Sequence, residues 1–545
     1  MASPAVCKLD AQEGEETGLL WQGCVQVKAP NMWLKESVGL YCQYAAAGLL
    51  YGSAGTLQPF CVYVYKGDPN VCSNSSNIAF FAWNCKLIFA IIVDCWHPFG
   101  LRRKSWMLIG FTLVLMLLFM LALFCDQLTT SEWLATMLLM QLCLMFSTVP
   151  ADGYSIELGE LEPLAQKGKI LITGQRIFFI FCMVAGAIQS LLLNGPSTNP
   201  QDCDISFNSC WSWGLTPKQY YSLLFGIVLC LTGPMLFLRE RKPTVSAPPH
   251  SIAGLMKAIW LIMHNLTTIY ILIFVIGIGA LTNFTSQVNN YLQYYVIILT
   301  NFEAGIDSTS TYACLVLAIY IFQTYLMNTN WRTTQYFAVI FSAILGLLWI
   351  PAYYNFSGTR TAWYTIFVDL DQSFVNGLTQ VIYSLAVMEL AKPGQEATTF
   401  ELVATVGNAA CAMSGIFATQ LLGPLKCIGC TLASNSTHNC TLDVVDLNSI
   451  SAYESSNGPQ RFTVYSLMLI GISIVCTLIF TPFCPKNKAE CHEWRRLGDL
   501  RPSYWRPYLG FFLSFFVIIY GFVAAVLLLV PSTSCLPEVG GMGCL

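Results

Sequence analysis

Long apolar runs alternate with short polar breaks along almost the whole chain. Most runs hold about 20 residues, enough for an α-helix to cross the hydrocarbon core of a bilayer. The pattern predicts thirteen spanning helices, and the expected fold class is therefore an all-α membrane protein. The stretch 282–308 fits either a helix at the membrane surface or an extension of its neighbours. The predicted spans are 38–61, 77–96, 105–125, 132–150, 170–193, 218–238, 257–281, 309–328, 334–354, 364–390, 398–424, 462–483 and 508–530.

The composition supports this fold class. Hydrophobic residues make up 55% of the 545 residues and charged residues only 10%, against about 25% charged in a typical soluble domain. No basic region with interleaved aromatic residues occurs, so the expected partner is the lipid bilayer and not nucleic acid. The five histidines are dispersed. Without metal-ligand spacing or a nucleophile motif, we expect no metal, no cofactor and no enzymatic activity.

Charges in the short loops predict the orientation. With the N-terminus in the cytoplasm, the inner loops hold sixteen lysines and arginines and the outer loops five, as the positive-inside rule requires. N-x-S/T glycosylation triplets at Asn74, Asn355, Asn435 and Asn439 then all lie outside, which suits the plasma membrane, our first choice, and equally an acidic organelle. The preferred outer disulfide is Cys203–Cys210, and one from Cys427 or Cys430 to Cys440 is second.

A lysine stands in the middle of the second predicted span. Lys86 lies eight residues before Asp94, which places it about 12 Å deeper along a helix and near the middle of a core about 30 Å thick. An ionisable side chain at that depth is costly unless it is paired or hydrated, so it marks a binding site or a pathway by default. The alternative is a structural ion pair with an acid on a neighbouring helix.

The second span ends in Asp94 and is followed by Pro-Phe-Gly and three consecutive cations. A glycine permits a tight turn, and an aspartate with two arginines can bridge helix ends when an inner gate is shut. The run resembles the D-x-x-G-R-R loop of the major facilitator superfamily, which implies two six-helix halves oriented alike. The predicted inner gate comprises Asp94, Arg102 and Arg103, with Asp152 and Glu389 from the loops after the fourth and tenth spans.

This resemblance implies twelve core helices in two halves, and the thirteenth apolar run adds one helix to them. No cleavable signal peptide is visible in the first 36 residues, so the first span is expected to act as the targeting signal. The predicted parts are a cytoplasmic tail (1–36), an N-terminal half (37–242), a C-terminal half (243–484) with a long outer loop (425–461), a basic cytoplasmic linker (485–507), an extra helix (508–530) and an outer tail (531–545).

The tenth span carries polar residues on one face. Asp369, Gln372, Asn376 and Gln380 are spaced so that they fall on one side of a helix. Lipid does not accommodate such a face, so we expect it to line a watery cavity or contact another polar helix. The alternative is hydrogen bonding that only holds helices together.

Two inner segments occupy equivalent places in the two halves, and each combines acids with a proline and a glycine. Such a correspondence is typical of an internal repeat, and parallel halves around a midplane site are a transporter design. Arg176, about 9 Å into the fifth span, is expected to be either a substrate cation or a partner of Asp152. The first segment holds Asp152, Glu157, Glu160 and Glu162, and the second holds Glu389, Lys392, Glu396, Glu401 and Asn408.

Three patches together resemble the folate–biopterin transporter family of the major facilitator superfamily. They are Trp83-x-x-Lys86, the run from Asp94 to Arg103 with the aspartate-led segment 152–176, and MELAKPGQEATTFELVATVGN at 388–408. The family pairs a W-x-x-K with an aspartate and P-x-x-G-x-R-R, and opens its eleventh helix with E-x-x-x-P-G-x-E-A-T-x-F-x-L-x-x-x-x-x-N. The likeness spreads over roughly residues 38–483, and the thirteenth span and the loop 425–461 depart from it.

The resemblance implies uptake of folate, biopterin or a related pterin. The residues suit such a small organic anion, because Lys86 and Arg176 can pair with a carboxylate and Trp83 can stack on a flat ring. Gln372, Asn376 and Gln380 offer amide partners for the ring edges, and Asp369 suits the adjacent N–H groups of a pterin. We expect alternating access coupled to a proton, carried by Asp369 or, as second choice, by Glu396. The alternatives are another organic solute, such as S-adenosylmethionine, a nucleoside or an amino acid, and a receptor that binds ligand without transporting it.

Overall fold

Helices make up the structure. The computed structural model describes residues 35–67, 71–72, 75–159, 162, 168–198, 210–238, 240, 251–282, 289, 292–297, 299–390, 396–426, 457–500, 504–530, 533 and 536. Every regular element in these residues is helical and none is a strand, so the all-α prediction is confirmed for them.

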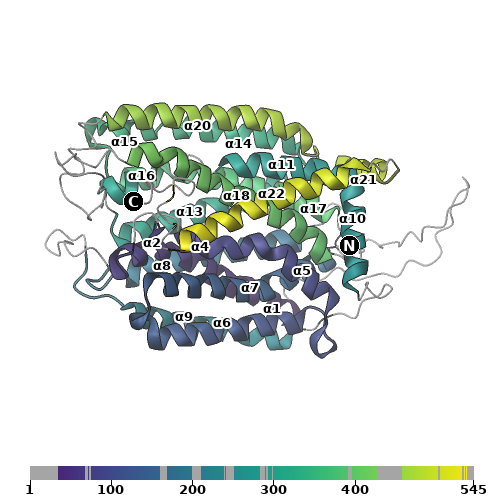
Figure 1. Cartoon of the computed structure of the whole chain (residues 1–545), viewed down its shortest axis with the longest axis horizontal. Helices are drawn as coiled ribbons and strands as arrows, with labels where there is room; N and C mark the ends of the chain where they lie inside the picture. Colours follow the sequence, from purple (N-terminus) through teal and green to yellow (C-terminus); the bar gives the residue numbers. More distant parts are fainter. Residues whose placement is uncertain are drawn as a thin grey trace, which may run out of the picture.

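Long helices run roughly side by side along the molecule (Figure 1). Short 3₁₀ and π turns extend or interrupt several of them. The α-helices of more than five residues are α1 (Lys35–Gly52), α4 (Ser75–Phe80), α5 (Lys86–Cys95), α6 (Lys104–Phe124), α7 (Thr130–Gly159), α8 (Lys169–Leu192), α9 (Pro217–Thr232), α10 (Ile252–His264), α11 (Leu266–Thr282), α13 (Asn301–Ile321), α14 (Trp331–Gly346), α15 (Trp349–Tyr354), α16 (Ala362–Val368), α17 (Leu370–Met388), α18 (Glu396–Lys426), α20 (Gly458–Phe480), α21 (Lys488–Leu500) and α22 (Trp505–Leu529).

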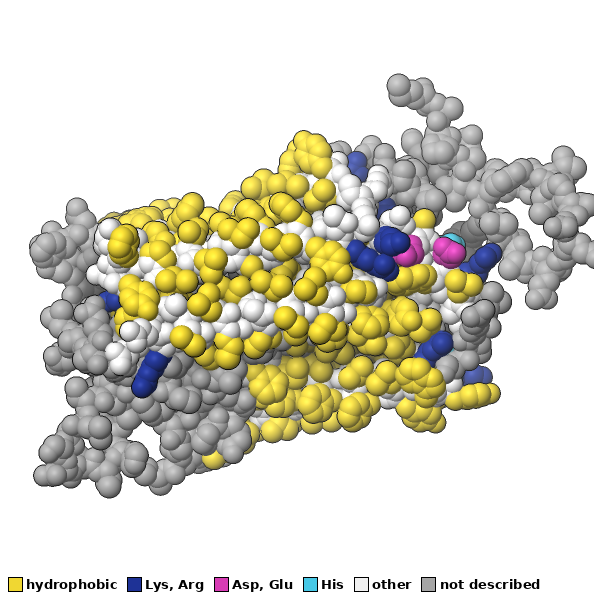
Figure 2. Space-filling model, turned by 90° about the horizontal axis from the view of Figure 1, so that it is seen from above, with side chains coloured by type: hydrophobic (Ala, Val, Ile, Leu, Met, Phe, Trp, Pro, Cys, Tyr) yellow, Lys and Arg dark blue, Asp and Glu magenta, His cyan; other side chains and the backbone are white. Residues whose placement is uncertain are grey.

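The surface and the helix lengths fit a membrane. Within the described residues, nine helices are long and apolar enough to cross a bilayer, and the α10–α11 pair makes up to ten. Hydrophobic side chains cover the middle of the face in Figure 2, and charged side chains lie toward its ends. The chain is a multi-pass membrane protein. Its orientation and the identity of the membrane stay predictions.

The buried side chains form two large clusters. The larger draws mainly on residues 40–238 and the second mainly on residues 262–491. The early helices, purple and blue in Figure 1, accordingly lie on one side of the bundle and most of the later helices on the other. The two groups meet along two seams, α5 against α18 and α8 against α13. The limits of the predicted six-helix halves stay a prediction.

Small residues bring α8 and α13 close together. A Cβ on Gly305 would stand 2.4 Å from the main-chain nitrogen of Ser190, and one on Gly186 would stand 2.9 Å from that of Thr309. Glycines at such crossings let two membrane helices approach to backbone contact. This seam therefore tolerates no side chain at either glycine.

The fourth span is longer than predicted. The sequence placed its end at Pro150, but α7 continues through this proline to Gly159. Proline is tolerated inside membrane helices when neighbouring groups satisfy the freed carbonyl. Asp152 and Glu157, expected in a loop, are therefore helical, and Asp152 is buried.

The second span is broken where one continuous helix was expected. The 3₁₀ segment η3 (Phe81–Cys85) separates α4 from α5, so Lys86 is the first residue of α5 and not the middle of a regular helix. A 3₁₀ stretch inside a helix often marks a functional site or a hinge.

Two further parts of the chain differ from the predicted spans. The seventh span bends by 82° between α10 and α11, at Asn265, whose side chain donates to the carbonyl of Arg495 at 3.0 Å. The eighth span begins at Asn301, eight residues before its predicted start. Within the ambiguous stretch 282–308, residues 292–297 form a π-helical turn.

The extra helix is present, as predicted. Helix α22 runs obliquely across the bundle, yellow in Figure 1. It contacts α4 and η3 of the first group of helices and α10, α11 and α18 of the second. It therefore lies over the α5–α18 side of the molecule and bridges both groups.

One disulfide joins Cys61 and Cys72, a pair that the sequence analysis did not propose. Cys210 is also disulfide-bonded, and its predicted partner Cys203 lies outside the described residues. Asn355 is exposed at the end of α15. The other glycosylation candidates, Asn74, Asn435 and Asn439, lie outside the described residues, so glycosylation stays a prediction.

Candidate functional site

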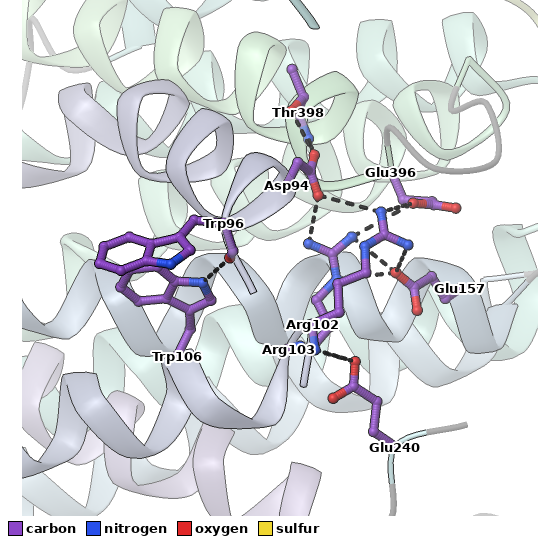
Figure 3. A network of polar contacts seen from close by, with 9 residues as sticks. All are labelled: Asp94, Trp96, Arg102, Arg103, Trp106, Glu157, Glu240, Glu396 and Thr398. Atoms are coloured by element: carbon purple, nitrogen blue, oxygen red, sulfur yellow. Dashed lines mark hydrogen bonds and ion pairs between the residues drawn. The ribbon is translucent and has the colours of Figure 1, made fainter. Parts of the chain in front are cut away.

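The fully buried Arg103 and the partly buried Arg102 join helices of both groups where α5 and α7 end and α18 begins (Figure 3). Arg103 Nη1 lies 2.7 Å from Asp94 Oδ1 and Nη2 lies 2.9 Å from Glu157 Oε1. Arg102 Nη2 lies 3.0 Å from Glu396 Oε2, and its Nη1 lies 3.2 Å from Glu157. These five residues form the arginine cluster. Because its acids belong to α5, α7 and α18, the cluster ties the first group of helices to the second.

The first turn of α18 also binds Asp94. The Thr398 N–H donates to Asp94 Oδ2 at 3.0 Å, and the Thr398 hydroxyl donates to the same oxygen at 2.6 Å. A carboxylate at a helix N-terminus meets N–H groups that have no partner within the helix and the positive end of the helix dipole. Glu240 accepts hydrogen bonds from the main-chain N–H groups of Arg102 and Arg103 at 3.1 and 2.9 Å. These bonds hold the loop that precedes α6.

Three of the five predicted gate residues meet in this cluster, namely Asp94, Arg102 and Arg103. Glu396, the second choice as proton carrier, lies beside both arginines. Its position at the start of α18 makes it a bridge between the helix groups.

The other two predicted gate residues lie elsewhere. Asp152 lies beside Lys86, one turn and more before Glu157 on α7. Glu389 is buried at the end of α17, where its main-chain carbonyl accepts a hydrogen bond from Arg495 at 2.6 Å.

The break in the second span is held by side chains of α18. The Leu87 N–H donates to Thr405 Oγ1 at 2.8 Å, and Asn408 Nδ2 donates to the carbonyl of Trp83 at 3.2 Å. Main-chain groups released from a regular helix need such partners inside a membrane protein. The backbone around Lys86 is therefore fastened directly to the opposite group of helices.

Lys86 is buried between two acids. Its Nζ lies 3.0 Å from Asp152 Oδ2 and 3.2 Å from Glu401 Oε2, and the three side chains are 6%, 10% and 0% exposed. We call these residues the Lys86 triad. The structural ion pair, left open as an alternative from the sequence, is thus present, and it spans the α5–α18 seam. The two hypotheses for Lys86, a binding site or pathway and a structural ion pair, therefore concern the same three residues.

Hydroxyl groups complete the surroundings of Asp152. The Tyr44 hydroxyl donates to Asp152 Oδ1 at 2.8 Å and contacts Ser155 Oγ at 2.9 Å. Tyr383 of α17 interacts electrostatically with both Lys86 and the acids. Four helices and the broken span thus converge on the triad.

Aromatic rings flank the triad on one side. Lys86 Nζ lies 5.0 Å from the centre of the Trp83 ring, a cation–π distance. Trp83 Nε1 donates to Gln141 at 3.2 Å, and its ring lies 4.9 Å from Tyr51 and 6.0 Å from Phe178. A charged group and flat apolar faces therefore stand next to each other at this depth.

Arg176 is not with Asp152. It donates to Gln323 at 3.2 Å and lies 6.0 Å from the centre of the Tyr320 ring. Among the described residues it makes no ion pair. Of its two predicted roles, the partner of Asp152 finds no support, and the substrate cation stays a prediction.

The polar face of the tenth span is divided. Asp369 lies between α16 and α17, while Asn376 and Gln380 are partly buried on α17. Gln380 hydrogen-bonds Tyr383 and so reaches the neighbourhood of the triad. The side chain of Gln372 lies outside what the structure describes. The four residues therefore do not form one site. Gln380 approaches Lys86 through Tyr383, whereas Asp369 lies about two turns before Asn376 and farther from Gln380.

A second acid accompanies Asp369. Asp307 of α13 interacts electrostatically with Asp369, and Asp307 Oδ1 has no hydrogen-bond partner among the described residues. Asp307 was not predicted as a site residue, because it lies in the stretch 282–308, for which the sequence predicted no single structure.

Three other residues of the site were missed. Glu401, Thr398 and Tyr44 received no role from the sequence. Glu401, Thr405 and Asn408 are spaced at i, i+4 and i+7 within the predicted span 398–424, so they fall on one helix face; this spacing could have suggested Glu401. Tyr44 lies in an apolar run and carries no such signal.

No family model matches the chain and no curated protein matches it. Similar solved structures include a variant of the E. coli fucose:proton symporter FucP, which is 15% identical, with 81% of this chain and 97% of that chain covered and a TM-score of 0.49. FucP in the outward conformation, described as a major facilitator superfamily transporter, has the same identity and coverage at a TM-score of 0.48. The nucleoside transporter NupG is 14% identical, with coverages of 82% and 98% and a TM-score of 0.48.

Proposed function

We propose that this protein is a secondary transporter of the major-facilitator type, moving a small organic anion of the folate or pterin class by alternating access. The observation that carries the proposal is a pair of polar clusters on one seam. The arginine cluster and the Lys86 triad both join the first group of helices to α18.

The arginine cluster has the properties of a gate. The contacts of Glu396 with the arginines and of Thr398 with Asp94 join α18 to the first group of helices, so these contacts exist only while this end of the bundle is closed. Charged groups can leave such a cluster because water solvates them when the end opens, whereas an apolar contact would have to expose hydrophobic surface. A closed gate built from ion pairs is therefore reversible.

The Lys86 triad and its aromatic neighbours have the properties of a solute site. An ionisable group at mid-depth is expected to mark a substrate or ion pathway. The ammonium group supplies a partner for a carboxylate. Trp83, Tyr51 and Phe178 supply faces on which a flat ring can stack. A pterin ring that carries an acidic side chain combines both features.

Transport of an anion against its concentration gradient requires a coupled ion, and we propose that this ion is the proton. A carboxyl group inside the protein is the natural carrier. Asp369 remains one candidate because Asp307 faces it, and two neighbouring carboxyl groups are more stable together when they share a proton. Glu396, by contrast, is engaged with Arg102 in the gate.

Binding and transport are tested separately on the purified full-length protein. Thermal shift is measured with folate, methylfolate, biopterin, pterin and S-adenosylmethionine, for wild type, Lys86→Ala and the exposed-lysine control Lys218→Ala. We expect one class of ligand to raise Tm in wild type and in the control but not in Lys86→Ala. The binding proposal fails if no pterin shifts Tm, or if Lys86→Ala responds as wild type does.

Counterflow of labelled folate in proteoliposomes then tests movement. Accumulation above equilibrium, driven by unlabelled folate inside, supports a transporter. Binding without counterflow would make the protein a receptor and refute transport. Counterflow of a nucleoside or S-adenosylmethionine in place of folate would refute the pterin class but retain the transporter.

A further inference from the structure

The Lys86 triad has an unbalanced charge. One ammonium group faces two carboxyl groups, and none of the three side chains is more than 10% exposed. If both acids are ionised, the cluster keeps an excess negative charge inside the membrane-spanning part of the protein. An uncompensated buried charge costs several kcal/mol, so the cluster is complete only with one more positive charge.

The hydrogen bonds identify the acid that needs this charge. Both oxygens of Asp152 are engaged, Oδ1 by the Tyr44 hydroxyl and Oδ2 by Lys86. Glu401 Oε1 accepts from Lys86 at 3.3 Å. Its Oε2 lies 3.2 Å from the same ammonium nitrogen as an ion-pair contact, but accepts no hydrogen bond from any described residue. Glu401 is also the fully buried member. It therefore has an oxygen ready to hold a proton.

A proton on Glu401 would also have an acceptor. The carboxyl groups of Asp152 and Glu401 lie 3.0 and 3.2 Å from the same Lys86 Nζ, and Glu401 interacts with Asp152 through a side-chain hydrogen bond. Two carboxyl groups can form such a bond only if one of them is protonated. The pair can thus share one proton while Lys86 faces the single remaining negative charge.

No other acid or cation in the described residues replaces this proton. The titratable groups facing the triad from other helices are the hydroxyls of Tyr44 and Tyr51 on α1 and of Tyr383 on α17. Helix α11, which packs on α18, has Tyr270 as its one titratable residue. Helix α22 contributes Tyr520, stacked on Phe417 of α18, and its Arg506 lies in the first turn at the gate end.

We propose that the Asp152–Glu401 pair carries the transported proton, and that the proton releases Lys86 to bind the anionic group of the solute. This inference rests on the proposed proton-coupled transport. A proton binds Glu401 Oε2, which leaves the triad neutral. The solute carboxylate then takes the place of Glu401 beside Lys86. When the other end opens, solute and proton leave, and the ionised Glu401 returns to Lys86.

Charge balance makes the two binding events depend on each other. Without the proton, the triad has a net charge of −1, and binding an anion would make it −2. With the proton the triad is neutral, so binding the anion brings the net charge only to −1. Each ligand therefore increases the affinity for the other by the same factor, as linkage requires. A cationic solute would instead compete with the proton for the excess negative charge. A cation bound at this site could therefore be transported only in exchange for a proton.

The first test follows the proton itself and needs no solute. Infrared difference spectra of the reconstituted full-length protein are recorded against pH for wild type, Glu401→Gln, Asp369→Asn and the exposed-acid control Asp126→Asn. We expect one band of a buried protonated carboxyl group to be lost in Glu401→Gln and to persist in the two aspartate variants, while a band of the Asp307–Asp369 pair would remain in Glu401→Gln and change in Asp369→Asn. A Glu401→Gln spectrum that has lost no such band overturns the assignment.

The second test follows coupling, with folate as the probe. In wild type we expect external protons to increase the apparent affinity for folate by about 5- to 150-fold, the usual range of a coupling free energy. Glu401→Gln should bind folate at every pH as protonated wild type does, and should retain counterflow. A pH dependence that survives in Glu401→Gln overturns the inference. Absence of folate binding in wild type refutes the proposed substrate, while the infrared result still decides the proton site.

The thermal stability of single and double variants of the triad separates a folding defect from a loss of function. Lys86→Met leaves two buried acids without a cation and is expected to lower Tm, since breaking a buried ion pair costs about 3–5 kcal/mol. Adding Glu401→Gln to Lys86→Met should restore part of that loss. If Glu401→Gln worsens the double variant, the excess charge does not reside on Glu401 and the inference is wrong.

Discussion

The Thr398 hydroxyl offers the cleanest perturbation of the gate. Thr398→Val keeps the shape of the side chain and removes one hydrogen bond, the 2.6 Å contact to Asp94 Oδ2. The main-chain bond from the Thr398 N–H at 3.0 Å and the ion pair of Asp94 with Arg103 at 2.7 Å remain. Because Asp94 and Thr398 belong to opposite groups of helices, the lost bond stabilises only the closed gate.

The size of the effect follows from burial. Thr398 is 0% and Asp94 1% exposed, so no water replaces the lost donor in the closed state. A hydrogen bond to a charged group contributes about 1.5–3 kcal/mol. In the open state both groups are hydrated and lose nothing. At 1.4 kcal/mol per factor of ten, the equilibrium between closed and open gate should shift toward open by about 10- to 150-fold.

Hydrogen exchange read by mass spectrometry measures this shift on peptides covering the end of α5 and the start of α18. Amides at both ends should exchange faster in Thr398→Val by a similar factor. Thr399→Val is the matched control, because the Thr399 hydroxyl is buried on the same turn without a hydrogen-bond partner among the described residues. Equal exchange in the two variants would show that the Asp94–Thr398 bond does not hold the gate.

Two further predictions concern packing and pH. A Cβ on Gly48 would lie 2.0 Å from a main-chain carbonyl oxygen of α8, whereas one on Gly226 meets nothing within 4 Å; Gly48→Ala should therefore lower Tm through overpacking of about 1–3 kcal/mol, while Gly226→Ala leaves it unchanged or raises it. Glu162, in the loop between α7 and α8, accepts three main-chain hydrogen bonds at 2.7–3.1 Å, yet burial outweighs them and raises its pKa to about 7. The folded state thus binds this proton more tightly than the unfolded state, so the stabilisation is present below the unfolded pKa near 4.5 and is lost as pH rises through 7. Unfolding curves of wild type should show this loss relative to Glu162→Gln, and parallel pH profiles of the two proteins would contradict it.

The sequence alone determined the class of the protein and the places of most helices. Hydropathy is a local property, so the thirteenth span and the starts of α6, α8 and α20 could be predicted within a few residues. The turn after Asp94 could also be predicted from the sequence, because the glycine and the two arginines lie close together in the chain. Counting residues along one helix predicted the depth of Lys86 in the membrane.

Only the tertiary structure decided what Lys86 meets. Glu401 is separated from it by 315 residues, and no local pattern states which helix of one group faces which helix of the other. One error of boundary added to this: α7 continues through Pro150, so Asp152 appeared to be a loop residue, whereas Glu401 already lay inside the predicted span 398–424. Whether a proline ends a helix depends on the partners its neighbours supply, and these exist only once the helices have packed.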